Sequence, residues 1–75
     1  MREYTIVLDP NPEEGIYTVT VPTLPGCITQ GKDVEECIVR AKEAIATWIA
    51  DAVAHGEPIP EETMRPQVVT IGVAA

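Results

Sequence analysis

The sequence predicts an α+β fold in the order β-β-β-α-β, a small sheet with one helix packed on one face. Three observations lead to this prediction. Short stretches near the N-terminus alternate apolar with polar residues, one long stretch repeats apolar residues at helical spacing, and a final stretch alternates again. A helix before the last strand lets that strand lie parallel to an earlier one while the helix covers the sheet. A chain of 75 residues is expected to form a single domain, 1–75.

The first two predicted strands form a pair joined by a turn. Glu3–Leu8 and Ile16–Val21 both alternate, and the second is rich in the β-branched and aromatic residues that strands favour. Between them, Asp9–Gly15 contains two prolines and a glycine, which is typical of a turn between antiparallel strands. Two sets of side chains are expected to share a face within their strand: Tyr4, Ile6 and Leu8 in the first, and Tyr17, Val19 and Val21 in the second.

A proline-rich turn separates the second strand from a short third one. Pro22 cannot donate a hydrogen bond to a strand ladder, and Pro25 with a glycine follows soon after, so the second strand ends there. Leu24, between the prolines, is expected to point into the core. Cys27–Gln30 is then a short strand that Gly31 closes.

One helix is predicted from Val34 to Ala54. Asp33 is its N-cap, and Glu36 at position N3 completes an acidic variant of the capping box. Gly56 follows as a C′ glycine, and His55 beside it can place a cation at the negative end of the helix dipole. The apolar stripe expected along this helix is Val34, Cys37, Ile38, Ala41, Ile45, Trp48, Ile49 and Ala52.

The last part of the chain is predicted to be a connector followed by a strand. Glu57–Pro66 is polar, holds three prolines and is expected to be ordered, with half a turn of helix at Glu61–Met64. Gln67–Val73 alternates again and is predicted to be the final strand.

The charge of the chain argues against nucleic-acid binding. Twelve acidic residues against five scattered basic ones give a net charge of −7. Nucleic-acid binding draws on clustered lysines and arginines, so no direct nucleic-acid binding by this chain is expected. A basic protein partner fits the charge. So does the plainer interpretation that an acidic surface keeps the protein soluble.

Size and patterning also bear on location and assembly. No apolar run approaches the ~20 residues of a membrane helix, and the N-terminus has no apolar signal segment. We therefore expect a cytoplasmic protein without membrane association. A small core and exposed strand edges predict a homodimer or a dimer of dimers, through sheet or helix pairing. Cys27 and Cys37 are too few for a disulfide framework and are expected to be reduced core residues.

No catalytic, cofactor-binding or metal-ligating residues are predicted, and therefore neither a cofactor nor an enzyme. The paired carboxylates fall in a turn, a helix start and the connector, where solvation or capping accounts for them. The strand interiors carry Thr, Val, Ile and Tyr rather than the convergent carboxylates of a metal-dependent nuclease. Trp48, on the helix stripe, is expected to anchor the core or a dimer interface.

The densest group of motifs resembles a known family. Tyr17–Gly31 reads Y-T-V-T-V-P-x-L-P-G-C-x-T-Q-G, and E-E-C (Glu35–Cys37) and A-K-E-A-I (Ala41–Ile45) follow. Together these resemble the HicB-like antitoxin family, with a likeness that runs from Tyr4 to about Trp48. The resemblance implies a partial ribonuclease H-like β-β-β-α-β fold without catalytic residues. It also implies a partner, a small basic toxin that cleaves mRNA and that the antitoxin binds and blocks.

Two departures from that family's pattern bear on function. Many members carry a C-terminal DNA-binding segment that represses their own operon, whereas this sequence ends at Ala75, so we expect a short form without that segment. The family often has an acidic residue where Thr23 stands, and threonine or serine where Asp33 caps the helix. Asp33 keeps the capping chemistry, while Thr23 removes a charge from the turn.

The leading hypothesis is therefore an antitoxin-like protein that neutralises a small basic toxin by protein contact. We expect the contacts in the acidic connector, the turn and the helix start. The turn and helix residues are Thr23, Leu24, Pro25, Gly26, Asp33, Glu35 and Glu36. The alternatives are a stand-alone oligomeric binding module without a toxin partner and, less favoured, a metal-dependent nuclease.

Overall fold

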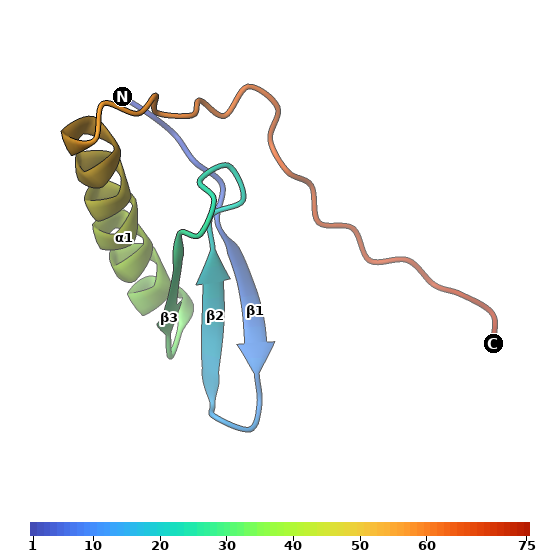
Figure 1. Cartoon of the computed structure of the whole chain (residues 1–75). Helices are drawn as coiled ribbons and strands as arrows, with labels where there is room; N and C mark the ends of the chain where they lie inside the picture. The colour runs from blue at the N-terminus through green and yellow to red at the C-terminus, as the bar shows by residue number, and fades with distance from the viewer.

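A three-stranded antiparallel sheet and one helix make up the folded body. The structure is a computed structural model that describes residues 1–75. Strands β1 (Val7–Asn11), β2 (Ile16–Thr20) and β3 (Ile28–Gly31) lie in the order β1-β2-β3. The helix α1 (Val34–Ala54) packs on one face of this sheet (Figure 1). The predicted α+β class with a single helix on one face is confirmed.

The core lies between the helix and the strand faces expected from the alternation. Val19 of β2 is fully buried with Cys37 and Ala41 of α1. A second buried group joins Leu24 and Cys27 to the end of β2. The partly buried side chains around the two groups are Tyr4, Ile6, Leu8, Tyr17, Ala44, Ile45 and Trp48.

The first strand begins and ends later than predicted. It pairs with β2 from Val7 opposite Thr20 to Asn11 opposite Ile16. The chain that would continue β2 turns away at Pro22, so the residues before Val7 have no strand to pair with on that side. The turn between the strands is correspondingly short and closes where the Gly15 N–H donates to the Asn11 carbonyl at 2.9 Å.

The proline-rich turn folds back on itself to bury Leu24. The Leu24 N–H donates to the Val21 carbonyl at 3.0 Å, and the Cys27 N–H donates to the Leu24 carbonyl at 3.1 Å. Gly26 provides the left-handed residue that this reversal needs, with a φ of 76°. As a result Leu24 is 1% exposed, as the sequence predicts.

The helix has the predicted bounds and caps. The Asp33 carboxylate accepts from the Glu36 N–H at 2.8 Å. The Glu36 carboxylate accepts from the N–H of Lys32 at 3.1 Å, one residue before the position that a capping box uses. At the other end, Gly56 has a φ of 66° and its N–H donates to the Val53 carbonyl, which completes the predicted glycine cap.

The apolar stripe of the helix is only partly covered. Cys37, Ala41 and Ala52 are buried, but Val34 and Ile38, which the sequence places on the stripe, are exposed. The reason is that α1 lies over β3 and β2 and does not extend over β1 (Figure 1). One flank of the helix therefore keeps apolar side chains in solvent.

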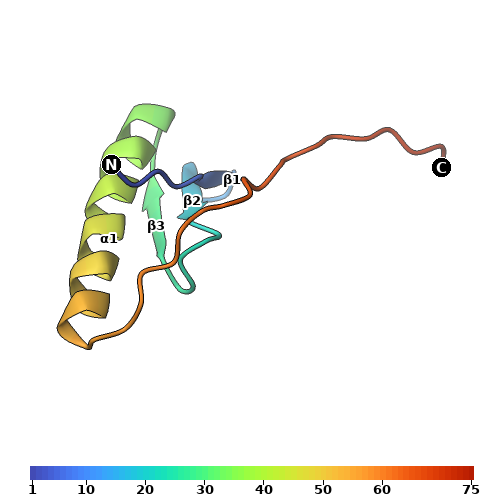
Figure 2. The same ribbon diagram turned by 90° about the horizontal axis from the view of Figure 1, so that it is seen from above.

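The predicted final strand is absent from the sheet. After the connector, Gln67–Val73 runs extended and away from the folded body (Figures 1 and 2). Its four large apolar side chains are 74% to 79% exposed. A strand is stabilised only when a neighbour supplies its backbone hydrogen bonds, and no segment of this chain lies beside the tail. The half turn of helix predicted at Glu61–Met64 is also absent, since the connector contains only a bend. No helix of the chain has the length and apolar character needed to cross a bilayer.

Candidate functional site

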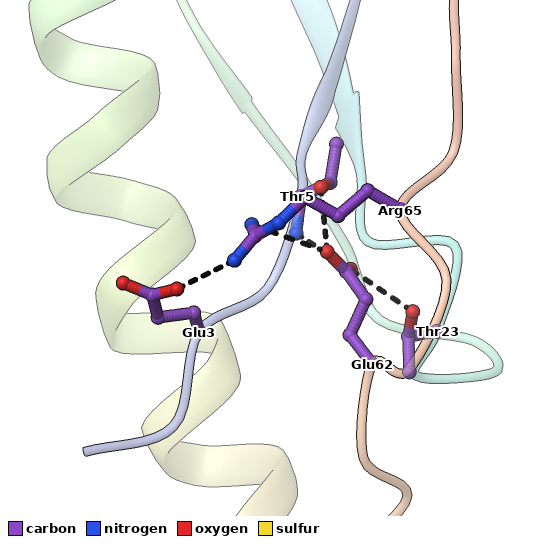
Figure 3. Close-up of polar contacts among 5 residues, drawn as sticks. All are labelled: Glu3, Thr5, Thr23, Glu62 and Arg65. Carbon is purple, nitrogen blue, oxygen red and sulfur yellow. Dashed lines mark hydrogen bonds and ion pairs between the residues drawn. The ribbon is translucent and has the colours of Figure 1, made fainter.

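A buried carboxylate from the connector holds the start of the chain to the proline-rich turn (Figure 3). Glu62 accepts from both the backbone N–H and the hydroxyl of Thr5, each at 2.7 Å. It also accepts from the Thr23 hydroxyl at 3.1 Å. These bonds lie where β2 has turned away at Pro22, so the carboxylate takes the place of the missing strand partner of Thr5.

Glu62 is ionised, and both of its carboxylate oxygens accept hydrogen bonds. Its side chain is 1% exposed. The N–H of Thr5 contributes most to holding the pKa of this carboxyl below its ordinary value, followed by the Thr5 hydroxyl, while burial acts in the opposite direction. The Thr23 hydroxyl and the Arg65 guanidinium lower the pKa further. A carboxylate whose oxygens already accept hydrogen bonds in this way holds the backbone in place, and it is not free to act as a general base.

Charged side chains around Glu62 tie the connector to the N-terminal segment. Arg65 contacts both Glu62, at 3.5 Å, and Glu3. The Tyr4 hydroxyl donates to the Pro60 carbonyl at 2.6 Å. Exposed ion pairs contribute little stability, so Glu62 and Tyr4 are the main anchors of this arrangement. We call residues 60–65 with residues 2–5 and Thr23 the connector clamp.

The connector clamp was not predicted from the sequence. The sequence predicts that the Glu61-Glu62 pair lies in a solvated loop, which is correct for exposed Glu61 but wrong for Glu62. A separation of 57 residues lies between Thr5 and Glu62. No local pattern marks a contact over that distance. A usable signal is indirect: Pro22 interrupts the ladder opposite Thr5 and leaves that N–H in need of another acceptor.

The predicted contact residues of the turn have unequal access to the surface. Pro25 and Gly26 are exposed, Thr23 is half-buried against Glu62, and Leu24 faces the core. The indole N–H of Trp48 donates to the Pro25 carbonyl at 2.9 Å and ties the turn to the helix. Trp48 therefore anchors the core of its own chain, one of the two roles expected for it.

An open groove of about 530 Å³ runs beside this turn, between the outer edge of β3 and the helix. Its floor is apolar and its helix side is charged. The lining side chains that carry this character are Ile28, Trp48, Arg40, Glu43 and Asp51. The groove combines an unpaired strand edge with charged residues of both signs, which suits contact with another polypeptide.

The predicted contact residues of the helix start lie at the opposite end of the sheet. Asp33 and Glu36 are occupied as caps, while Glu35 is exposed. Because β1 and β3 both end where β2 begins, the first turn of the helix shares this end with the β1–β2 hairpin (Figure 1). We call this region the acidic end. Its carboxylates are Glu13, Glu14, Asp33, Glu35 and Glu36.

The remaining reactive groups have structural roles in this fold. Burial raises the pKa of the Cys27 thiol. It also raises that of Cys37, and the charges of Asp33 and Glu36 add to the effect. Both thiols are therefore protonated near neutral pH, which is the opposite of an activated nucleophile. His55 sits at the end of the helix with Nδ1 2.8 Å from the Asp51 carbonyl. No group of three or more His, Cys, Asp or Glu side chains is placed to hold a metal ion.

Comparison with known proteins places these residues in a family. The family model described as a HicB-like antitoxin of bacterial toxin–antitoxin systems matches residues 4–70. A UPF0150 protein of Thermoplasma acidophilum is 43% identical over 60 residues, which cover 80% of this chain and 86% of that protein. A UPF0150 protein of Synechocystis is 36% identical over 61 residues, covering 81% and 76% of the two chains. A UPF0150 protein of Archaeoglobus fulgidus is 45% identical over 47 residues, covering 63% and 67%.

Proposed function

Because the chain belongs to the HicB-like antitoxin family of bacterial toxin–antitoxin systems, we propose that it binds and neutralises a small basic toxin that cleaves mRNA. The match over residues 4–70 is the observation that carries this proposal, because it spans the sheet, the helix and the connector. The proposed action is by protein contact and without catalysis. A partner that cleaves mRNA makes the cytoplasm the compartment in which the complex forms.

Electrostatics supports a basic partner. The chain has a net charge of −7, and two of its five basic residues, Arg2 and Arg65, pair with carboxylates of the connector clamp. The excess negative charge therefore falls elsewhere, and much of it lies at the acidic end. Opposite charges on two partners raise the association rate and disfavour wrong partners.

The acidic end is the first surface that we assign to the toxin. It combines exposed Glu35 with the carboxylates of the hairpin, on rigid elements at one end of the sheet. Pro25 and Gly26 lie at the other end and are a second, separate contact region. Leu24 supports that region from the core, and its side chain makes no direct contact in this proposal.

A pull-down tests the proposal. The chain is co-expressed with the small basic protein encoded beside it, and the toxin is then assayed for mRNA cleavage with and without the chain. We expect a stable complex and protected RNA. Glu13→Lys/Glu35→Lys reverses two charges at the acidic end and is expected to weaken binding at least tenfold, mainly through a slower association rate.

A matched single change separates local from overall charge. Glu57→Lys reverses one charge, as Glu35→Lys alone does, at an exposed position away from the acidic end and from the groove beside the turn. We expect Glu57→Lys to bind within about threefold of the unmodified chain, since distant surface charges are screened beyond about 10 Å. Equal weakening by Glu35→Lys and Glu57→Lys would remove the acidic end from the proposal. Failure to bind the adjacent basic protein, or unprotected RNA in the presence of a complex, would refute neutralisation itself.

A further inference from the structure

The C-terminal tail, Gln67–Val73, has the pattern of a strand but no partner in its own chain. Val69, Ile71 and Val73 share one side of the extended tail, and Val68 with Thr70 lies on the other. All of its large apolar side chains are exposed. An exposed apolar strand with unpaired backbone groups is a site for pairing with another strand.

The outer edge of β1 is open to such a strand. The Val21 N–H donates to the Cys27 carbonyl at 3.1 Å, so Val21 and, by alternation, Val19 turn their backbone groups toward β3. Leu8 lies directly opposite Val19 and therefore directs its N–H and C=O away from β2, to the open edge. Pro10 lacks an N–H and restricts pairing to the part of the edge before it.

The helix leaves an apolar strip uncovered beside the N-terminal segment that leads into β1. On the flank of α1 that faces the N-terminal segment, Ile45 and Ile49 line a depression of about 370 Å³ together with Tyr4. Ile38 is exposed on the same flank, one helical turn before Lys42 of that depression. A strand that follows β1 and the extended residues before it would pass Tyr4, which lines this depression.

We propose that two copies of this chain exchange tails, so that Gln67–Val73 of each copy pairs with the open β1 edge of the other. Val69, Ile71 and Val73 then pack against the uncovered flank of the partner's helix. At ~3.3 Å per residue the tail spans about 23 Å, enough to follow β1 and the extended residues just before it. This proposal is independent of the toxin proposed above.

Three features favour a second copy over the tail's own sheet. The connector clamp fixes the chain up to Arg65, and Pro66, whose φ is restricted, follows directly. The folded body therefore determines the direction in which the tail leaves it. From there the tail runs clear of its own β1 in both views (Figures 1 and 2). The tail also carries no charged side chain, so it can enter a second molecule of net charge −7 without adding like charge.

Exchange also covers the open β1 edge of both copies. A reciprocal exchange is an isologous two-fold contact in which each tail covers one edge and each edge receives one tail. It closes with two copies and leaves no further tail to recruit a third. The small core of each body gains the apolar surface that it lacks.

The test measures the mass of the chain in solution by size exclusion with light scattering at micromolar concentration. We expect twice the 8.1 kDa of one chain. Val69→Lys/Ile71→Lys places charges on the side facing the helix and should give the monomer mass. Val68→Lys/Thr70→Lys adds the same charge on the opposite side and should remain a dimer. Circular dichroism of each variant reports whether the helix is retained.

A second measurement identifies which tail occupies the edge. Isotopically labelled and unlabelled chains are mixed, and filtered nuclear Overhauser effects are recorded between Ile71 of one copy and Ile49 of the other. We expect cross-peaks between copies. A monomeric unmodified chain, a dimer that survives Val69→Lys/Ile71→Lys, equal loss of the dimer in both lysine pairs, or cross-peaks confined to one copy would each overturn the proposal.

Discussion

The close approach of β3 to the helix makes Gly31 the position where one added methyl group should cost most. A Cβ at this position would lie 2.8 Å from both the backbone nitrogen and Sγ of Cys37. It would also lie 3.0 Å from Cα of Cys37. Ordinary contact begins at 3.4 Å, so β3 and the first turn of α1 would have to move apart. Two of the three obstructing atoms are backbone and cannot turn away.

We expect Gly31→Ala to destabilise the fold by about 2 kcal/mol, since overpacking a well-filled core typically costs about 1–3 kcal/mol. A domain of this size loses roughly 4–8 °C of Tm per kcal/mol, so the melting temperature should fall by about 8–16 °C. Urea and thermal unfolding followed by circular dichroism, at one protein concentration, measure both quantities.

Two variants make this prediction specific. Gly72→Ala adds a methyl group with nothing within 4 Å and should leave the stability unchanged. Cys37→Ala removes only Sγ, so in combination with Gly31→Ala it should recover a minor part of the loss. The reasoning is refuted if Gly31→Ala is as stable as the unmodified chain. It is also refuted if the double variant is as stable as Cys37→Ala alone, because the side chain and not the backbone would then be the obstacle.

Three further predictions concern the connector clamp and the turn. The lowered pKa of Glu62 means that its stabilising effect is present above its unfolded pKa of about 4.3 and is lost as the pH falls through the lower folded value. Glu62→Gln should thus be less stable at pH 7 and show a flatter loss of stability below about pH 4.3 in urea titrations; an unchanged acid slope would contradict this. Thr23→Asp places a second carboxylate beside Glu62 and should destabilise the fold at pH 7, with most of the loss recovered when Glu62→Gln is added; simple additivity of the two changes would exclude the contact. Trp48→Phe loses the hydrogen bond to the Pro25 carbonyl and should cost about 1 kcal/mol in the same assay, whereas an unaltered midpoint would show that this bond does not stabilise the turn.

The helix and its caps were predictable because their signals are local. Asp33 and Glu36 lie within one turn of the helix start, and Gly56 follows the last turn directly. The same applies to Leu24, which two nearby prolines and a glycine force into a tight reversal. In each case the residues that determine the conformation are separated by only a few positions, so the sequence pattern and the physical interaction coincide.

The connector clamp and the tail were not predictable in this way. Glu62 is buried only because a chain segment from the far N-terminus brings Thr5 to it. The alternation of Gln67–Val73 indicates a segment suited to a sheet, but it does not say which chain's sheet the segment joins. Periodicity reports which side chains prefer burial, whereas pairing depends on where a partner edge lies in space.

Most residues of the motif that carries the family likeness stabilise the fold. Within it, Leu24 and Cys27 fill the core, the Pro25 carbonyl holds Trp48, and Gly31 admits the start of the helix. None of these roles depends on the identity of a partner, so the motif can persist while partners differ. Specificity must then come from exposed residues, since only these can contact a second protein. On this chain the acidic end and the uncharged tail are such surfaces, and their opposite character suits two different partners: a basic protein for the first and a second copy for the other.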